Sequence, residues 1–146
     1  MKKILIINGP NLNLLGSREN KIYGNLTLDD IKNKCEKHAK SKKVEIQFFQ
    51  SNTEGEIIDK IHHVEDNYDG LIINPAAFTH TSIAILDSLR AISKPVIEIH
   101  LSNIYAREEY RKKSITSEGV DGLICGFGSL SYILAIEALS NLIYNK

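Results

Sequence analysis

Hydrophobic and polar positions along the chain follow two alternating patterns. Short, nearly continuous apolar runs indicate strands over residues 3–7, 44–49, 70–73, 95–100 and 122–125. Between these runs, apolar residues at helical spacing predict helices over residues 27–40, 52–67, 81–92 and 129–144. Strand therefore alternates with helix throughout, and this order is typical of a parallel sheet with helices on both faces.

The same alternation, without an internal repeat or a linker, predicts one domain over residues 1–146. We expect an α/β fold, specifically a flavodoxin-like three-layer sandwich with a five-stranded parallel sheet. In such sheets, ligands bind beyond the carboxyl ends of the strands, near the point where the strand order reverses. The residues that follow each strand are therefore the candidates for function.

Bulk composition narrows the class of protein and its partners. Hydrophobic residues make up 42% and charged residues 25%, and Lys plus Arg balance Asp plus Glu at 18 each. This balance is that of an ordinary globular protein and predicts no nucleic-acid or anionic-membrane partner. No apolar run approaches the roughly 20 residues of a membrane span, and the one near the start is too short for a secretion signal. The sequence therefore predicts a cytoplasmic protein, in which Cys35 and Cys125 stay reduced.

The connection after the first strand is unusually long. It contains the segment GPNLNLLGSREN at residues 9–20, roughly three times the usual length of a strand-to-helix connection. Arg18 and Tyr23 lie between Gly16 and Gly24, which are candidate hinges because glycine adopts backbone angles closed to other residues. We expect an active-site lid loop at about residues 16–25 that closes a base over a small-molecule substrate.

The end of the fourth predicted strand breaks the apolar pattern. Glu98, His100 and Ser102 alternate along the chain and so share one face of the strand. An inner parallel strand should be apolar on both faces, so this pattern predicts a cleft lined by a titratable pair and a hydroxyl. The alternatives are a strand end frayed into solvent and a core histidine with a satisfied hydrogen bond.

His80 follows the third predicted strand and begins a helix. With Asn74 just upstream, it is a candidate for binding substrate hydroxyls, although such a histidine is also common as a cap or a surface residue. His80, His100 and Glu98 are residue types that bind zinc or iron. However, Glu98 and His100 are close together on one strand and several arginines lie near them, which disfavours a cation, so we expect no metal.

Three sequence blocks resemble a known family. GPNLNLLGSREN with the YG that follows it, NPAAFTHTS, and EIHLSNIYAREEYR are similar to the signature blocks of type II 3-dehydroquinate dehydratase, and the resemblance runs nearly end to end. It implies a lyase of the shikimate pathway, which serves aromatic amino acid biosynthesis. The reaction is the anti elimination of water from 3-dehydroquinate through an enolate, giving 3-dehydroshikimate without a cofactor, metal or Schiff base. The resemblance also implies a homododecamer, a tetramer of trimers.

The resemblance assigns five catalytic roles. Tyr23 matches the base that removes the proton alpha to the ketone, and Arg18 matches the arginine that supports this base and the transition state. Asn11 matches the residue that holds a water against the enolate oxygen. His100 matches the general acid that protonates the departing hydroxyl, and Glu98 matches the acid beside that histidine.

The resemblance also implies a set of substrate contacts. Asn74, His80 and Arg111 match contacts to substrate hydroxyls. Leu101, through its backbone, and Ser102 match the carboxylate site. Asp87 matches a residue that reaches the site of a neighbouring subunit.

A phenol base needs positive charge nearby. A free tyrosine titrates near pH 10, and burial under a lid favours the neutral phenol, so one arginine barely suffices near neutral pH. We therefore expect Arg107 to act on Tyr23 as a second arginine. Four residues depart from the usual family pattern without removing a chemical group that the mechanism needs: Asn20 for proline, Ala76 for glycine, Phe78 for tyrosine and Ser131 for glycine.

Two other functions stay open at this point. The first is a non-enzymatic flavodoxin-like module, although the chain lacks the acidic residues of a receiver domain and the phosphate loop of a flavin or nucleotide binder after the first strand. The second is a metal-dependent hydrolase that uses His80 and His100. Flavin absorbance would support the first alternative, and loss of activity with a chelator would support the second.

Overall fold

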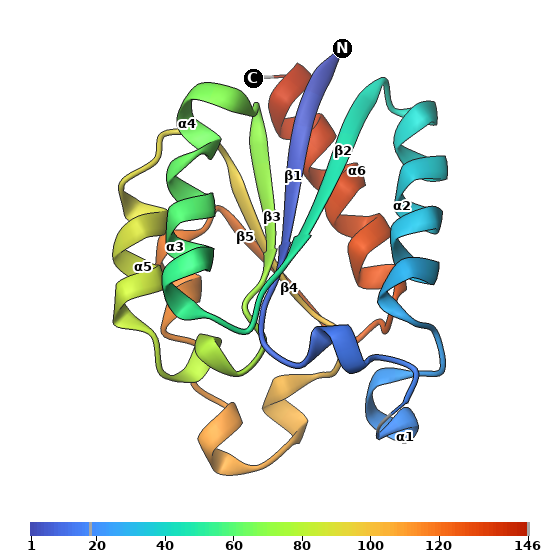
Figure 1. Ribbon diagram of the computed structural model, residues 1–146, viewed down its shortest axis with the longest axis vertical. Helices are drawn as coiled ribbons and strands as arrows, with labels where there is room; N and C mark the ends of the chain where they lie inside the picture. Colours follow the sequence, from blue (N-terminus) through green and yellow to red (C-terminus); the bar gives the residue numbers. More distant parts are fainter. Residues whose placement is uncertain (18, 146) are drawn as a thin grey trace.

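The computed structural model describes residues 1–17 and 19–145. Five parallel strands form one sheet in the order β2-β1-β3-β4-β5 (Figure 1). This is the flavodoxin-like order, and the predicted five-stranded parallel sheet is confirmed. The strands are β1 Lys2–Asn8, β2 Val44–Gln50, β3 Gly70–Asn74, β4 Val96–His100 and β5 Gly122–Cys125.

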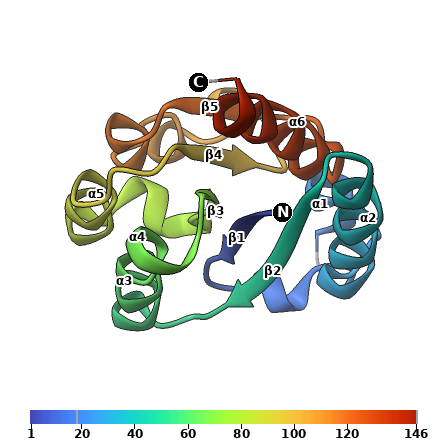
Figure 2. The ribbon, with the colours of Figure 1, turned by 90° about the horizontal axis from the view of Figure 1, so that it is seen from above.

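Helices cover both faces of the sheet, as the sequence predicts (Figure 2). On one face lie α2 (Leu28–Ser41) and α6 (Leu130–Tyr144). On the other face lie α3 (Glu54–His62), α4 (Val64–Asn67) and α5 (Ile83–Arg90). The sheet is therefore the middle of three layers.

The strands are apolar because both of their faces are buried. In β1, Ile4 and Ile6 pack toward α2 and α6, whereas Leu5 and Ile7 pack toward the opposite helices, and none of the four is more than 1% exposed. Each such side chain stabilises the fold by roughly 1.5–3 kcal/mol. Buried parallel strands therefore appear in the sequence as unbroken apolar runs.

The predicted helix over residues 52–67 is wrong in one respect, because it is two helices. His63 follows the last residue of α3 and precedes α4. Its backbone N–H is shared between the carbonyls of Asp59 and Lys60, which is the tightening that often closes a helix. By contrast, α2 begins where its pattern predicts, since Thr27 and Asp30 form a reciprocal capping box.

The connections contain short helices that no apolar periodicity indicates. Between β1 and α2 lie the 3-10 helix η1 (Leu12–Leu14) and the four-residue α1 (Asn20–Tyr23). The 3-10 helix η2 (Ala76–His80) follows β3. The crossover from β4 to β5 contains η3 Ile104–Ala106, η4 Glu109–Arg111 and η5 Thr116–Gly119. No helix in the described part of the chain is long and apolar enough to cross a bilayer.

Candidate active site

The carboxyl ends of β1, β3 and β4 lie at one edge of the sheet (Figure 1). The connections that follow these strands line a pocket. Its volume is about 120 Å³, which is small beside the roughly 300 Å³ or more of sites for drug-sized ligands. Predicted site residues that line it are Asn11, Tyr23, Asn74, His80, His100, Leu101, Ser102, Arg107 and Arg111.

Glu98 lies directly beneath the pocket and is paired with His100. Glu98 is 0% exposed and His100 is 5% exposed. One carboxylate oxygen of Glu98, Oε2, is 2.7 Å from Nε2 of His100. The strand end is therefore not frayed into solvent, and the histidine faces a pocket while a buried carboxylate orients its ring. Ser102 lies beyond the end of β4, in the turn that follows the strand, but still lines the pocket.

An arginine contacts the phenol oxygen of Tyr23. Nη1 of Arg107 donates hydrogen bonds to Oη of Tyr23 at 2.9 Å and to Oγ of Ser102 at 3.2 Å. The guanidinium carbon lies 5.2 Å from the centre of the Tyr23 ring. The contact that the charge argument predicts between these two residues is therefore present, although they are 84 positions apart. Arg18 lies outside the described residues.

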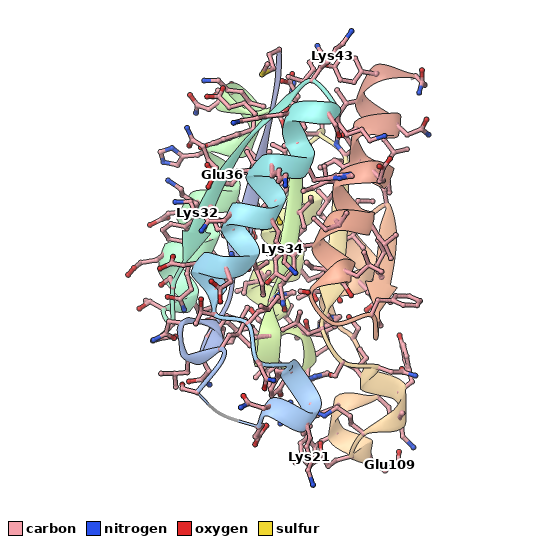
Figure 3. The ribbon with its side chains drawn as sticks, turned by 90° about the vertical axis from the view of Figure 1, so that its right-hand side faces the viewer. Lys21, Lys32, Lys34, Glu36, Lys43 and Glu109 are labelled. Carbon is pink, nitrogen blue, oxygen red and sulfur yellow. The ribbon has the colours of Figure 1, made fainter. Side chains whose placement is uncertain are left out.

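A second cation lies on the same side of the pocket. Nε of Arg111 donates to Oε2 of Glu108 at 2.6 Å, and its guanidinium carbon lies 5.4 Å from the centre of the Tyr110 ring. Burial lowers the pKa of Arg111, but the hydrogen bond to Glu108 and the nearby Tyr23 outweigh burial and hold this pKa above its usual value. Figure 3 shows that α1, marked by Lys21, and η4, marked by Glu109, lie at the same end of the molecule.

The amide of Asn74 is held at both of its ends. Its Nδ2 donates to Oη of Tyr132 at 3.2 Å, and its Oδ1 accepts the backbone N–H of Ala76 at 3.2 Å. Tyr132 in turn donates to Oδ1 of Asn8 at 2.6 Å. Tyr132 is fully buried, and burial raises its pKa well above the usual value. The amide orientation of Asn74 is therefore set before any ligand binds.

The backbone around Asn74 explains two features of the sequence. Ala76 has a φ of 54°, a left-handed conformation that costs an alanine about 1–2 kcal/mol and suits the glycine usual at this position in the family pattern. At Gly9, a Cβ would lie 2.4 Å from the carbonyl oxygen of Pro75. Only glycine therefore lets the connections after β1 and β3 approach this closely.

His80 is tied to the β4–β5 crossover. Its Nδ1 lies 2.8 Å from the backbone carbonyl oxygen of Lys113, so Nδ1–H donates and Nε2 is left for the pocket. Asp87, in contrast, lies exposed on α5 and does not line the pocket. Within the described residues, no group of three or more His, Cys, Asp or Glu side chains is placed to hold a metal ion.

Three residues that support the site belong to no motif that the sequence predicts. Ser114 and Thr116 donate hydrogen bonds to Glu98, and Tyr132 holds Asn74. Ser114 and Thr116 lie in a polar segment without a motif. The available signal was physical: a buried carboxylate needs donors, and a tyrosine at a core helix position needs a partner for its hydroxyl.

Comparison with known proteins gives one family. The chain matches the family model described as Dehydroquinase class II over residues 2–140. It is 59% identical over 147 aligned residues to the 3-dehydroquinate dehydratase of Clostridium botulinum (strain Okra / Type B1), with 100% of both chains covered.

Solved structures agree with this match. The type II dehydroquinase from Butyrivibrio crossotus DSM 2876 is 48% identical, with a TM-score of 0.93 over 94% of this chain and 97% of that one. The type II dehydroquinase from Propionibacterium acnes is 40% identical, with a TM-score of 0.94 over 97% of each chain. The three sequence blocks, the strand order and these matches lead to one conclusion: the chain belongs to the class II dehydroquinase family.

Proposed function

We propose that this protein is a hydro-lyase that removes water from 3-dehydroquinate to give 3-dehydroshikimate in the shikimate pathway. Membership of the family supports the reaction, and the relative at 59% identity is named for it. The observation that carries the mechanism is the 2.9 Å hydrogen bond from Arg107 to Tyr23, in the same pocket as the buried His100–Glu98 pair. A candidate base and a candidate acid therefore line one small pocket.

Tyr23 is the proposed base. A cation next to a phenol oxygen favours the phenolate, and Arg107 provides that charge. The phenolate takes the proton alpha to the ketone, and the electron pair of the C–H bond becomes the enolate. Arg18 supports the same charge on the strength of the family resemblance. Asn11, which lines the pocket, holds a water against the enolate oxygen.

His100 is the proposed acid. When the enolate collapses and the carbon–oxygen bond breaks, the departing hydroxyl takes a proton from the His100 imidazolium and leaves as water. The Glu98 carboxylate, 2.7 Å from Nε2, stabilises that imidazolium. The acid proton then leaves from the other ring nitrogen, Nδ1, because Nε2–H is bonded to Glu98.

The other lining residues fit the substrate's polar groups. We assign the substrate hydroxyls to Asn74, His80 and Arg111. We assign the substrate carboxylate to the hydroxyl of Ser102 and the backbone of Leu101. Arg107 donates to Ser102 as well as to Tyr23, so its positive charge also favours an anionic group at that position. The proposed reaction uses no metal or cofactor.

The segment at residues 16–25 is the proposed lid. Gly16 and Gly24 have φ values of 88° and 86°, so both ends of the segment use backbone angles that favour glycine. None of the four residues of α1, which lies between them, is fully buried. A segment with little buried surface opens at low cost, and its closure excludes water and brings Tyr23 to the substrate.

We also propose the dodecamer that the family resemblance implies, with Asp87 serving a neighbouring subunit's site. Asp87 and Ile83 lie one turn apart on α5, both exposed, and Ile83 is 63% exposed. Phe127 and Leu130, near the β5 edge, are 60% and 50% exposed. An assembly interface would remove these apolar side chains from water, which supports the proposal. The cytoplasmic location stays a prediction of the sequence.

The deciding experiment is a spectrophotometric assay of 3-dehydroquinate with wild type and Tyr23→Phe, before and after EDTA and borohydride. We expect wild type to form the conjugated, ultraviolet-absorbing product under all conditions and Tyr23→Phe to lose at least about 100-fold in rate. Tyr144→Phe is the matched control, because the Tyr144 hydroxyl donates to the backbone carbonyl of Lys43, far from the pocket. A folded wild type that converts nothing would overturn the proposal, and inhibition by EDTA would favour the metal-dependent alternative.

A further inference from the structure

Glu98 is a fully buried carboxylate that accepts hydrogen bonds from three side chains. Its Oε2 lies 2.7 Å from Nε2 of His100 and 3.0 Å from Oγ of Ser114. Its Oε1 lies 2.5 Å from Oγ1 of Thr116. A carboxylate without such donors would be destabilised by several kcal/mol in this position, so the donors are what make an ionised Glu98 possible there.

The two hydroxyls are oriented to donate to Glu98. The backbone N–H of Ser117 donates to Oγ of Ser114 at 3.1 Å, which leaves the Ser114 proton to point at the carboxylate. Thr116 is 0% exposed, so bulk solvent does not reach its hydroxyl. An ionised carboxylate only accepts, so both bonds are charge-assisted and among the stronger hydrogen bonds in proteins.

Ser114 and Thr116 belong to the same crossover that carries Arg107 and Arg111. The crossover is anchored beside η2 by two bonds at 2.8 Å: Nδ1–H of His80 donates to the Lys113 carbonyl, and the N–H of Ile115 donates to the Thr79 carbonyl. This anchoring places the two hydroxyls under the histidine while the arginines reach the pocket. The crossover from β4 to β5 therefore supports both the candidate acid, His100, and the candidate base, Tyr23.

We propose that Thr116, together with Ser114, is a positioning residue that sets how readily His100 gives up its proton. A lone buried carboxylate would hold the imidazolium proton tightly, because proton loss would leave its own charge unpaired. Hydroxyl donors stabilise the carboxylate in the state that remains after proton loss. Thr116 therefore makes His100 a better acid, and this inference rests on the proposed role of His100.

The pH dependence has a definite sign. Removing the Thr116 hydroxyl destabilises the state in which Glu98 is ionised and His100 is neutral. The imidazolium then keeps its proton to higher pH, so the alkaline limb of the pH–rate profile moves to higher pH. The other titratable or charged groups around the pair are Cys125 on β5, His80 after β3, and Tyr23, Arg107 and Arg111 across the pocket.

The test compares Thr116→Val, which keeps the shape without the hydroxyl, with Thr116→Ser, which keeps the hydroxyl. For Thr116→Val we expect kcat to fall about tenfold or more, KM to change less than about twofold, and the alkaline limb to rise by about half a pH unit or more. Thr116→Ser restores both kcat and the limb. Ser93→Ala is the matched control, because Ser93 donates to Glu65 on the opposite side of the fold and outside the pocket.

Three results separate the possibilities. Wild type without activity overturns the proposed function itself, whatever the variants do. Active wild type with an unmoved alkaline limb in a folded Thr116→Val overturns the positioning role alone. The positioning role is also overturned if Thr116→Ser does not restore the kcat lost in Thr116→Val. It is likewise overturned if Thr116→Val and Ser93→Ala lose the same Tm and the same kcat. Either result reduces Thr116 to a packing residue.

Discussion

Two residues that are far apart in the chain form the contact on which the proposed base depends. Arg107 follows η3 and Tyr23 ends α1, and their side chains meet at 2.9 Å. Charge reasoning predicted this partner from the sequence, because a phenol base needs more positive charge than one arginine supplies. The hydrogen bond to Ser102 holds the guanidinium in place, so the cation is oriented as well as near.

Arg107→Ala tests this contact. Without the cation the phenolate is less favoured, so the acidic limb of the kcat/KM profile, on which the base ionises, should move up by about one pH unit or more. Arg107→Lys keeps the charge without the planar guanidinium and should shift the limb less. An unmoved limb in a folded Arg107→Ala would remove Arg107 from the mechanism. The Thr116 variants move the alkaline limb instead, so the two effects are separable.

At the scale of elements, the lid and the crossover carry the residues that the sheet cannot supply. Strands β3 and β4 end at the pocket with Asn74 and His100. The candidate base and the two arginines that line the pocket, Arg107 and Arg111, come from short helices or turns beyond the strands. These connections have no apolar periodicity, since they bury few apolar side chains and are held by individual hydrogen bonds.

The lid predicts a specific pattern of proteolysis. We expect trypsin to cut the free protein first within residues 16–25, because α1 has no fully buried residue. Saturation with 3-dehydroshikimate to about ten times its Kd should slow that cut about tenfold, since only the closed form binds. Cleavage beside Lys113, which lies in the crossover, is the internal comparison. A first cut outside the lid, or a ligand-independent rate, would contradict the lid.

At the scale of the whole molecule, the face of α5 opposite the sheet is partly apolar and carries Asp87. Ile83 is exposed although it is the first residue of a helix whose other large apolar side chains are buried. The proposed dodecamer would place this isoleucine in an interface, beside the carboxylate that the family resemblance assigns to another subunit's site. In the proposed dodecamer, activity and assembly would be linked through this one helix.

Ile83→Asp and Asp87→Ala separate assembly from chemistry. Ile83→Asp should lower the assembly mass in sedimentation, because a charge replaces apolar surface, and activity should fall with it. Asp87→Ala should keep the mass and lower activity. Both residues are exposed, so the fold of a single chain should tolerate both changes within about 0.5 kcal/mol. A monomeric wild type, or a fully active dissociated Ile83→Asp, would contradict the role of Asp87 in a neighbouring site.

The sequence alone determined the layers of the fold and most of the pocket. Strand and helix follow from local apolar periodicity, and the carboxyl ends of parallel strands must meet at one edge, so Asn74, Glu98 and His100 could be placed together without coordinates. Ala76 could be marked as unusual because it stands where the family pattern has glycine. Its positive φ gives the reason.

Only the tertiary structure decided which donors serve the buried groups. The bonds from Ser114 and Thr116 to Glu98, and from Tyr132 to Asn8, join residues 16, 18 and 124 positions apart. Likewise, the break at His63 and the short helices of the crossover have no periodic signal. The physical reason is that a buried polar group requires some partner, but which partner reaches it depends on the path of the chain and on the register of the packed elements.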